Sequence, residues 1–133
     1  MSIFEVRGGK KLFGEITPQG AKNEALQIIS AVLLTNEEVL IKNIPDIIDV
    51  NLLIELLGEM NVKIKRIDLH TCSFKADAVN VEYLQSHDYH KKSARLRGSV
   101  MLAGPLLARF KKAAVAIVMI SSAQFFKTNN VCV

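Results

Sequence analysis

The sequence has no tryptophan, only two cysteines, and aromatic side chains at just 6% of its 133 positions. A sheet that stacks nucleic-acid bases needs exposed aromatic rings, so this scarcity argues against nucleic-acid binding, although a basic nucleic-acid-binding module stays open as an alternative. Cys72 and Cys132 lie far apart and form no ligand pattern. We therefore expect reduced thiols and no metal site.

Long apolar runs are also missing. No stretch reaches the length that spans a bilayer, and the first residues lack the basic region and apolar core of a secretory signal. We therefore expect a cytoplasmic protein with no membrane partner. Half of the residues are hydrophobic and 23% are charged, which is typical of a globular domain of this length.

Acidic residues are absent from the last third of the chain. All 13 acids lie between Glu5 and Asp88, whereas only basic charges follow from Tyr89 to Val133. This division of charge indicates an anionic partner for the second part, or a part that lacks the polypeptide that would neutralise it.

The hydrophobic pattern predicts an α/β fold with helices on one side of a mixed sheet. Residues 4–7 and 12–16 alternate with period two around a glycine turn, which predicts a β-hairpin. Gly20 opens a helix to residue 34 that is apolar on nearly every side after Leu26 and too short to span a bilayer, so we expect it in the core. The other expected elements are strand 38–44, a helix from 46 or 49 to 60, strands 62–67 and 71–76, a helical turn near Tyr83, a helix over 93–110 kinked at Pro105, and strand 113–120. We predict no helix or strand for residues 121–133.

Cations stand at the starts of both helices that we expect to be buried. Lys22 opens the first helix, and four cations lie around the start of the third: Lys91, Lys92, Arg95 and Arg97. A helix N-terminus carries partial positive charge, so each cation there is unfavourable by up to ~1 kcal/mol unless it is paired or solvated. One interpretation is that both starts face a shared phosphate or carboxylate, with Arg97 binding it bidentately and Lys22 as a point charge. The alternative is that all of these are solvated surface residues.

Other polar residues have plainer interpretations. Asn23 is expected to cap the first helix and Ser93 the third. Met101 and Met119 are expected to fill the core. The three histidines are not at metal-ligand spacing and are expected at the surface: His70, His87 and His90.

Several motifs within residues 1–110 together carry a family resemblance. They are Phe4-x-Val6-x-Gly8, Leu12-x-Gly14-Glu15, Gly20-Ala21-Lys22-Asn23-x-Ala25-Leu26, Asn43-Ile44-Pro45-x-Ile47-x-Asp49-Val50, and Arg97-x-Ser99 with Gly104-Pro105-Leu106-x-Ala108-Arg109-Phe110. In this register the sequence resembles the UDP-N-acetylglucosamine enolpyruvyl transferases (1-carboxyvinyltransferases), which perform the first committed step of bacterial peptidoglycan precursor synthesis. An enolpyruvylshikimate phosphate synthase is the nearest alternative.

The resemblance implies an inverse α/β barrel of two domains, each built from βαββαβ units around buried helices, with the active site between the domains. Residues 1–20 would be a hairpin that belongs to the second domain. Residues 21–120 would be the first βαββαβ repeat and the start of the next, and residues 121–133 a tail outside the family. The chain would correspond to about the first third of such an enzyme.

The resemblance also implies roles for three residues. Lys22 and Asn23 would contact phosphoenolpyruvate, and Arg97 would bind phosphoenolpyruvate and the phosphates of the nucleotide sugar. The reaction would transfer the enolpyruvyl group to the 3′-hydroxyl of UDP-N-acetylglucosamine and release phosphate, with no metal or other cofactor.

The likeness ends at about Val118, before the family's glycine-rich loop with the proton donor. Cys132 is not in that loop motif, so no catalytic residue is assigned in this chain. We expect a truncated chain that is inactive alone, whose last residues are read out of frame or otherwise replaced. A partly folded product that exposes strand edges and aggregates stays open beside this expectation.

Overall fold

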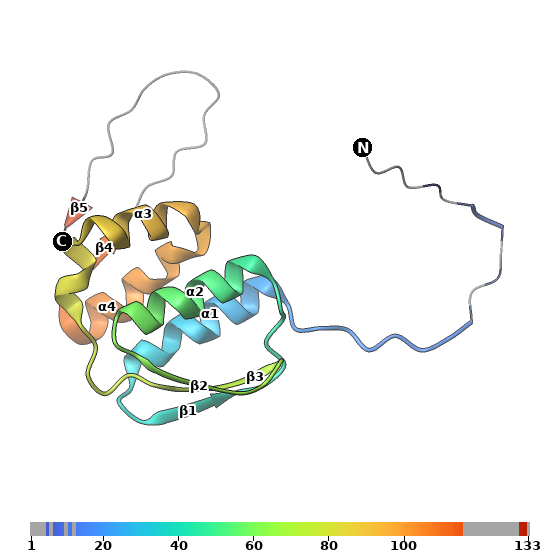
Figure 1. The fold of residues 1–133 in the computed structure, drawn as a ribbon, viewed down its shortest axis with the longest axis horizontal. Helices are drawn as coiled ribbons and strands as arrows, with labels where there is room; N and C mark the ends of the chain where they lie inside the picture. Colours follow the sequence, from blue (N-terminus) through green and yellow to red (C-terminus); the bar gives the residue numbers. More distant parts are fainter. Residues whose placement is uncertain (1–4, 6, 10, 12, 116–130, 133) are drawn as a thin grey trace, which may run out of the picture.

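The computed structural model describes residues 5, 7–9, 11, 13–115 and 131–132. Helices lie over one side of a three-stranded sheet, and residues 13–20 extend away from this body (Figure 1). Within the described part, no helix is both long and apolar enough to cross a membrane. The elements, with η for 3-10 helices, are α1 (Lys22–Ala31), η1 (Val32–Leu34), β1 (Glu38–Ile41), α2 (Ile48–Glu59), β2 (Lys63–Asp68), β3 (Thr71–Lys75), η2 (Val81–Gln85), α3 (His87–Arg95), η3 (Arg97–Leu102), α4 (Ala103–Phe110), β4 (Ala114–Val115) and β5 (Val131–Cys132).

The sheet has the order β1-β3-β2, and both pairings are antiparallel. The mixed sheet that we predicted is therefore wrong for the described strands, because β3 turns back directly from β2 and inserts beside β1. Phe74 of β3 lies opposite Val39 of β1 and Ile64 of β2. Its ring is fully buried, so this row of side chains forms the inner face of the sheet, beneath the helices.

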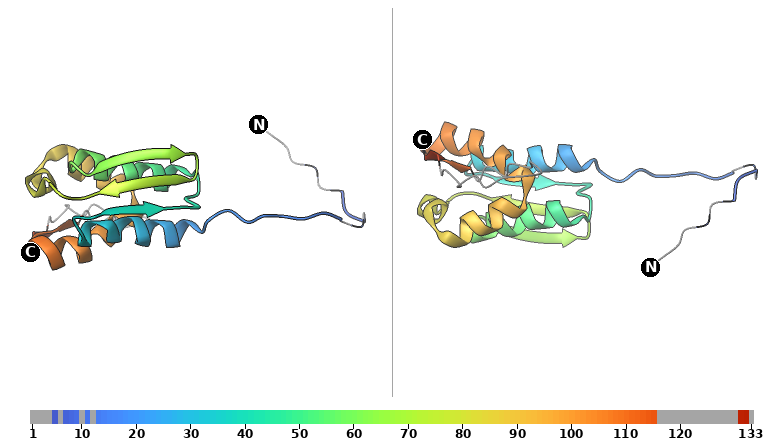
Figure 2. Two further views of the ribbon diagram at one scale, coloured as in Figure 1. Left: turned by 90° about the horizontal axis from the view of Figure 1, so that it is seen from below. Right: turned by 90° about the horizontal axis from the view of Figure 1, so that it is seen from above.

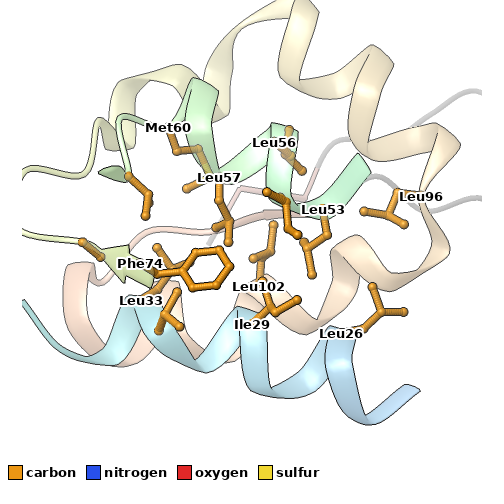
Figure 3. Packing of buried hydrophobic residues seen from close by; sticks show 14 of the residues in the cluster. Leu26, Ile29, Leu33, Leu53, Leu56, Leu57, Met60, Phe74, Leu96 and Leu102 are labelled. Carbon is orange, nitrogen blue, oxygen red and sulfur yellow. The ribbon is translucent and has the colours of Figure 1, made fainter. Parts of the chain in front are cut away.

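The two long helices, α1 and α2, lie side by side along the sheet (Figures 1 and 2). They run in the same direction, since Leu26 and Leu53 lie at one end of the core and Leu33 and Leu57 toward the other (Figure 3). The core position predicted for the first helix is confirmed for one face only, because Ile28 on the opposite face is 44% exposed. The largest fully buried aliphatic side chains among the described residues are one isoleucine and seven leucines: Ile29, Leu33, Leu53, Leu56, Leu57, Leu96, Leu102 and Leu106.

The single helix predicted over residues 93–110 is in fact three shorter pieces, α3, η3 and α4. The break after α3 falls at Leu96, whose backbone is extended (φ −115°, ψ 103°). Pro105 lies in the first turn of α4, where its missing N–H leaves no hydrogen bond unmade within that helix. In place of the expected kink, the chain changes from the 3-10 helix η3 to the α-helix α4 just before Pro105. The helical turn predicted near Tyr83 is confirmed as η2.

Ser93 is not an N-cap, which corrects our prediction. It lies inside α3 and is completely buried, where its hydroxyl donates to the His90 carbonyl oxygen. The true N-cap of α3 is Ser86, whose Oγ accepts the Tyr89 N–H at 3.0 Å. Ser86 was missed because the residues before Ser93 are polar and show no apolar stripe of helical period.

The β-hairpin predicted over residues 4–16 is absent from the described residues of that segment, which carry no strand. The side chains of Phe13 and Ile16 are fully or almost fully exposed, so nothing in this body provides a sheet for them. An isolated two-stranded hairpin is only marginally stable in water. Residues 4, 6, 10 and 12 lie outside the described residues.

The end of the chain also differs from expectation. The strand predicted over 113–120 is seen as β4, which pairs antiparallel with β5 in a segment where no element was expected. Residues 116–120, and with them Met119, lie outside the described residues. Met101, predicted as core filler, is 43% exposed, so that prediction is wrong.

Arg109 joins three elements that are distant in the sequence. Its Nη1 donates to the carbonyl oxygens of Leu33 at 2.9 Å, Thr35 at 2.8 Å and Ala76 at 2.9 Å. Its guanidinium carbon lies 4.9 Å from the centroid of the Phe110 ring. The side chain therefore ties α4 to the end of η1 and to the residue after β3, and it satisfies carbonyl groups that no regular hydrogen-bond ladder reaches.

Replacing Arg109 by methionine should lower the free energy of unfolding by roughly 2–3 kcal/mol, because the three carbonyl oxygens lose a charged donor and part of their surroundings is apolar. Urea unfolding followed by circular dichroism measures this. Arg95→Met is the matched control, since Arg95 is exposed in the last turn of α3. Equal losses in both variants would contradict the role given to Arg109.

Candidate functional site

The starts of three helical elements gather at one end of the core. An ion pair between Lys22 Nζ and Asp49 Oδ2 joins the first turns of α1 and α2. At the start of η3, a Cβ built on Gly98 would lie 2.9 Å from Leu26 Cδ1, so the backbone beside Arg97 packs against α1. Leu26, Leu53 and Leu96 mark the same end in Figure 3. We call this region the helix-start end.

A close backbone approach sets the position of α1. A Cβ on Gly20 would lie 2.0 Å from the carbonyl oxygen of Asn43 and 3.2 Å from Pro45 Cδ, so only glycine fits. Asn43 adopts a left-handed backbone conformation (φ 59°), which asparagine tolerates better than most residues. Two of the sequence motifs that carried the family resemblance therefore meet here, and their contact fixes where the helix of Lys22 begins.

The loop after β1 is held in turn by the β2–β3 connection. The Ile44 N–H donates to the His70 carbonyl oxygen at 2.8 Å, and His70 Nδ1 lies 2.8 Å from the Ile44 carbonyl oxygen. His70 is therefore half-buried rather than at the surface, and His90 is half-buried too, which corrects both predictions. His87 is exposed as predicted.

At the start of α1, no side chain caps the helix. The N-cap residue is Ala21, so the capping role predicted for Asn23 is wrong. Asn23 instead lies exposed in the first turn, beside Lys22, whose side chain is 50% exposed. The first-turn N–H groups thus receive no side-chain acceptor from an N-cap, which leaves them oriented toward the helix-start end.

The basic residues predicted to open the third helix divide into two groups. Lys92 and Arg95 lie in the last turn of α3, where a cation is favourable, and Lys91 lies in the middle of that helix, so the argument from a misplaced cation is wrong for all three. Lys92 Nζ contacts Glu59 Oε1 at 3.0 Å and Asp88 Oδ2 at 3.2 Å. Hydrogen bonds to these two carboxylates raise the pKa of Lys92 above its usual range.

Arg97 keeps the position that the argument required, because it is exposed and is the first residue of η3. Sequence reasoning missed Asp49, which stood in a quoted motif without a role. The sequence signal for Asp49 is an acid in the first turn of the helix that follows Pro45. The sequence does not show, however, that this helix runs parallel to α1 and that the two helix starts lie together.

A shallow hollow lies beside α1, between its first turns and the loop after β1. It is lined by residues that include Gly20, Glu24, Ile28, Lys42 and Ile44. Lys22, Asn23 and Arg97 are not among its lining residues. The hollow is therefore separate from the cations of the helix-start end.

The helix-start end carries groups of the kinds that bind anions in proteins. It offers the ammonium of Lys22, the amide of Asn23, the guanidinium of Arg97 and the first-turn N–H groups of α1, all of which favour phosphate or carboxylate. Groups of these kinds hold and orient an anion through charge and hydrogen bonds. Among the described residues, no three or more histidine, cysteine, aspartate or glutamate side chains gather in a group that could hold a metal ion.

The fold is similar to part of an enolpyruvyl transferase. The structure of the enolpyruvyl transferase NikO from Streptomyces tendae is similar to this chain, with a TM-score of 0.65 over 83% of this chain and 25% of that one. Sequence identity over the match is 23%, so this comparison concerns the fold. The α/β class predicted from the sequence is confirmed.

The family model for EPSP synthase (3-phosphoshikimate 1-carboxyvinyltransferase) matches residues 6–121. The chain therefore belongs to this family of carboxyvinyl transferases. It is 58% identical over 110 residues to the UDP-N-acetylglucosamine 1-carboxyvinyltransferase of Porphyromonas gingivalis and 56% identical over 116 residues to that of Bacteroides thetaiotaomicron. The matches include 83% and 87% of this chain, and the predicted resemblance is confirmed. The chain spans about a quarter of the length of these curated relatives, 25% and 27% respectively.

Gly20→Ala should lower the free energy of unfolding by about 2 kcal/mol or more, because the added methyl group meets a backbone oxygen that cannot move without displacing the loop. The amide resonances of Lys22 and Asn23 should shift as α1 is displaced. Gly104→Ala is the control, since nothing lies within 4 Å of its Cβ position and alanine favours the helix. A neutral Gly20→Ala would contradict the close approach.

Proposed function

We propose that this chain supplies part of the substrate site of a UDP-N-acetylglucosamine 1-carboxyvinyltransferase. The reaction transfers the enolpyruvyl group of phosphoenolpyruvate to the 3′-hydroxyl of UDP-N-acetylglucosamine and releases phosphate, with no cofactor. Its product serves cytoplasmic peptidoglycan precursor synthesis, and through it cell wall growth, cell shape and cell division. Both substrates are small molecules with several negative charges, which suits a site built from cations and helix N-termini.

The observation that carries the proposal is that the start of η3, which carries Arg97, packs against α1, which begins at Lys22: a Cβ on Gly98 would meet the side chain of Leu26, one turn after Lys22. In the proposed complex, the Lys22 ammonium and the Asn23 amide bind phosphoenolpyruvate. The Arg97 guanidinium binds phosphoenolpyruvate and the phosphates of the nucleotide sugar, for which its planar donors are well suited. The preference for an anion then comes from charge together with the first-turn N–H groups of α1, which receive no side-chain acceptor from the N-cap residue Ala21.

The remaining parts of the site belong to other segments of a complete enzyme. We propose that residues 1–20 are part of a second domain, that residues 21–120 are the first βαββαβ repeat and the start of the next, and that residues 121–133 lie outside the family pattern. The exposed side chains of Phe13 and Ile16 support the first of these assignments, because they suit a strand that pairs elsewhere. The chain alone is then expected to bind but not to turn over.

An enolpyruvylshikimate phosphate synthase is the second candidate, because the matching family model carries that description. The names of the relatives that share more than half of the aligned residues favour the sugar nucleotide instead. Comparing UDP-N-acetylglucosamine with shikimate 3-phosphate in the same titration separates them. A nucleic-acid module is disfavoured, because the ring of Phe74 is fully buried beneath the helices and cannot stack on a base.

Lys22→Met should weaken the binding of phosphoenolpyruvate to the 133-residue chain by about tenfold, because one charged contact with the anion is lost. Titration followed by amide chemical shifts measures the affinity. Lys65→Met is the matched control, since Lys65 is an exposed lysine on β2. The proposal fails if the two variants bind phosphoenolpyruvate equally well.

An assay of phosphate release with both substrates tests the expected inactivity. We expect no turnover by this polypeptide alone, because we propose that the proton donor lies in another segment of a complete enzyme. Turnover above the uncatalysed rate would show that the chain contains the reacting groups as well as part of the binding site.

A further inference from the structure

Asp49 lies between the starts of α1 and α2. It occupies the first turn of α2, where the positive end of the helix stabilises a carboxylate. Its ion-pair partner, Lys22, occupies the first turn of α1, where the same effect disfavours an ammonium. The one carboxylate is thus favoured by its own helix and offsets the unfavourable position of the lysine on the neighbouring helix.

The turn that carries Asp49 is firmly held. The next residue, Val50, is completely buried in the core. Asn51 Nδ2 donates to Asp46 Oδ1 at 2.8 Å, and Arg66 Nη2 donates to Asn51 Oδ1 at 3.0 Å. The ion pair therefore connects a fixed carboxylate to a long side chain that would otherwise move among many rotamers.

We propose that Asp49 is a positioning residue that orients the Lys22 ammonium toward the anion-binding region of the helix-start end. This inference rests on the function proposed above for Lys22 and extends it to a residue that does not itself touch the substrate. An ammonium has three N–H donors, so Lys22 keeps its contact with Asp49 while it donates to a phosphate or carboxylate of phosphoenolpyruvate.

Neutralising the Asp49 carboxylate should change the affinity for an anion in opposite directions, depending on whether Asp49 positions Lys22. A carboxylate beside an anion site repels the anion, so neutralising a carboxylate without a positioning role strengthens anion binding. Neutralising one that orients Lys22 weakens binding, because the freed side chain must then be ordered when the ligand arrives. Glu24 supplies the matched comparison, since it is an exposed acid in the first turn of α1.

The test compares Asp49→Asn, Asp49→Glu and Glu24→Gln in the 133-residue chain, each titrated with phosphoenolpyruvate and followed by amide chemical shifts. We expect Asp49→Asn to weaken binding about fivefold, and Asp49→Glu to recover most of the affinity. Glu24→Gln should bind as tightly as the unaltered chain, or more tightly. The inference is overturned if Asp49→Asn binds as tightly as Glu24→Gln.

A measurement without ligand separates this inference from the proposed function. Carbon-13 relaxation of the Lys22 side-chain methylenes should show larger motions in Asp49→Asn than in the unaltered chain and no change in Glu24→Gln. Equal mobility in all three overturns the positioning role, whatever the chain binds. If Lys22 loosens in Asp49→Asn but the unaltered chain does not bind phosphoenolpyruvate, the proposed function is rejected, and the ordering of Lys22 then serves no substrate.

Discussion

The contact between the backbone of Gly20 and the carbonyl oxygen of Asn43 is the constraint on which the helix-start end depends. It leaves no room for a side chain, and it sets the point at which the chain turns from the extended segment into α1. His70 is hydrogen-bonded to Ile44 in the same loop, so α1 begins against a loop that is itself anchored to the β2–β3 connection. The position of the first turn of α1, which carries Lys22 and Asn23, follows from this backbone arrangement and not from a side chain at the N-cap, which is Ala21.

The parallel course of α1 and α2 then decides the electrostatics of the region. Two helices that start at the same end add their partial positive charges there, and Lys22 adds a full one. Asp49 is the acid that lies within this field in direct contact with Lys22. This field suits the anionic ligand and the positioning role of Asp49 that we propose, and a pair of antiparallel helices would not provide it.

The elements with a strong apolar periodicity were predicted correctly from the sequence. The features that depend on contacts between residues far apart in the chain were not. Helices α1 and α2 and the three strands of the sheet were recognised from apolar spacing, and Lys22 and Arg97 from their charge at expected helix starts. The division of residues 93–110 into separate helices was missed, because the extended Leu96 and the N-cap Ser86 leave no trace in an apolar stripe. For the same reason Lys92 was assigned to an anion site, whereas Glu59 and Asp88 surround it. The pairing of Lys22 with Asp49 depends on the packing of two helices, which no local pattern reveals.

The strand order β1-β3-β2 has a consequence for how the chain folds. The β2–β3 pair is local, since Asp68 and Thr71 are partners across a short turn, whereas Ile41 must find Cys72 far along the chain. Closing the longer loop costs more chain entropy, so the hairpin of β2 and β3 is expected to form early and the addition of β1 to limit the refolding rate. Because β1 leads into the Asn43 turn, the helix-start end would be completed in the same late step. During refolding, the anion site that we propose would then form only after β1 has joined the sheet.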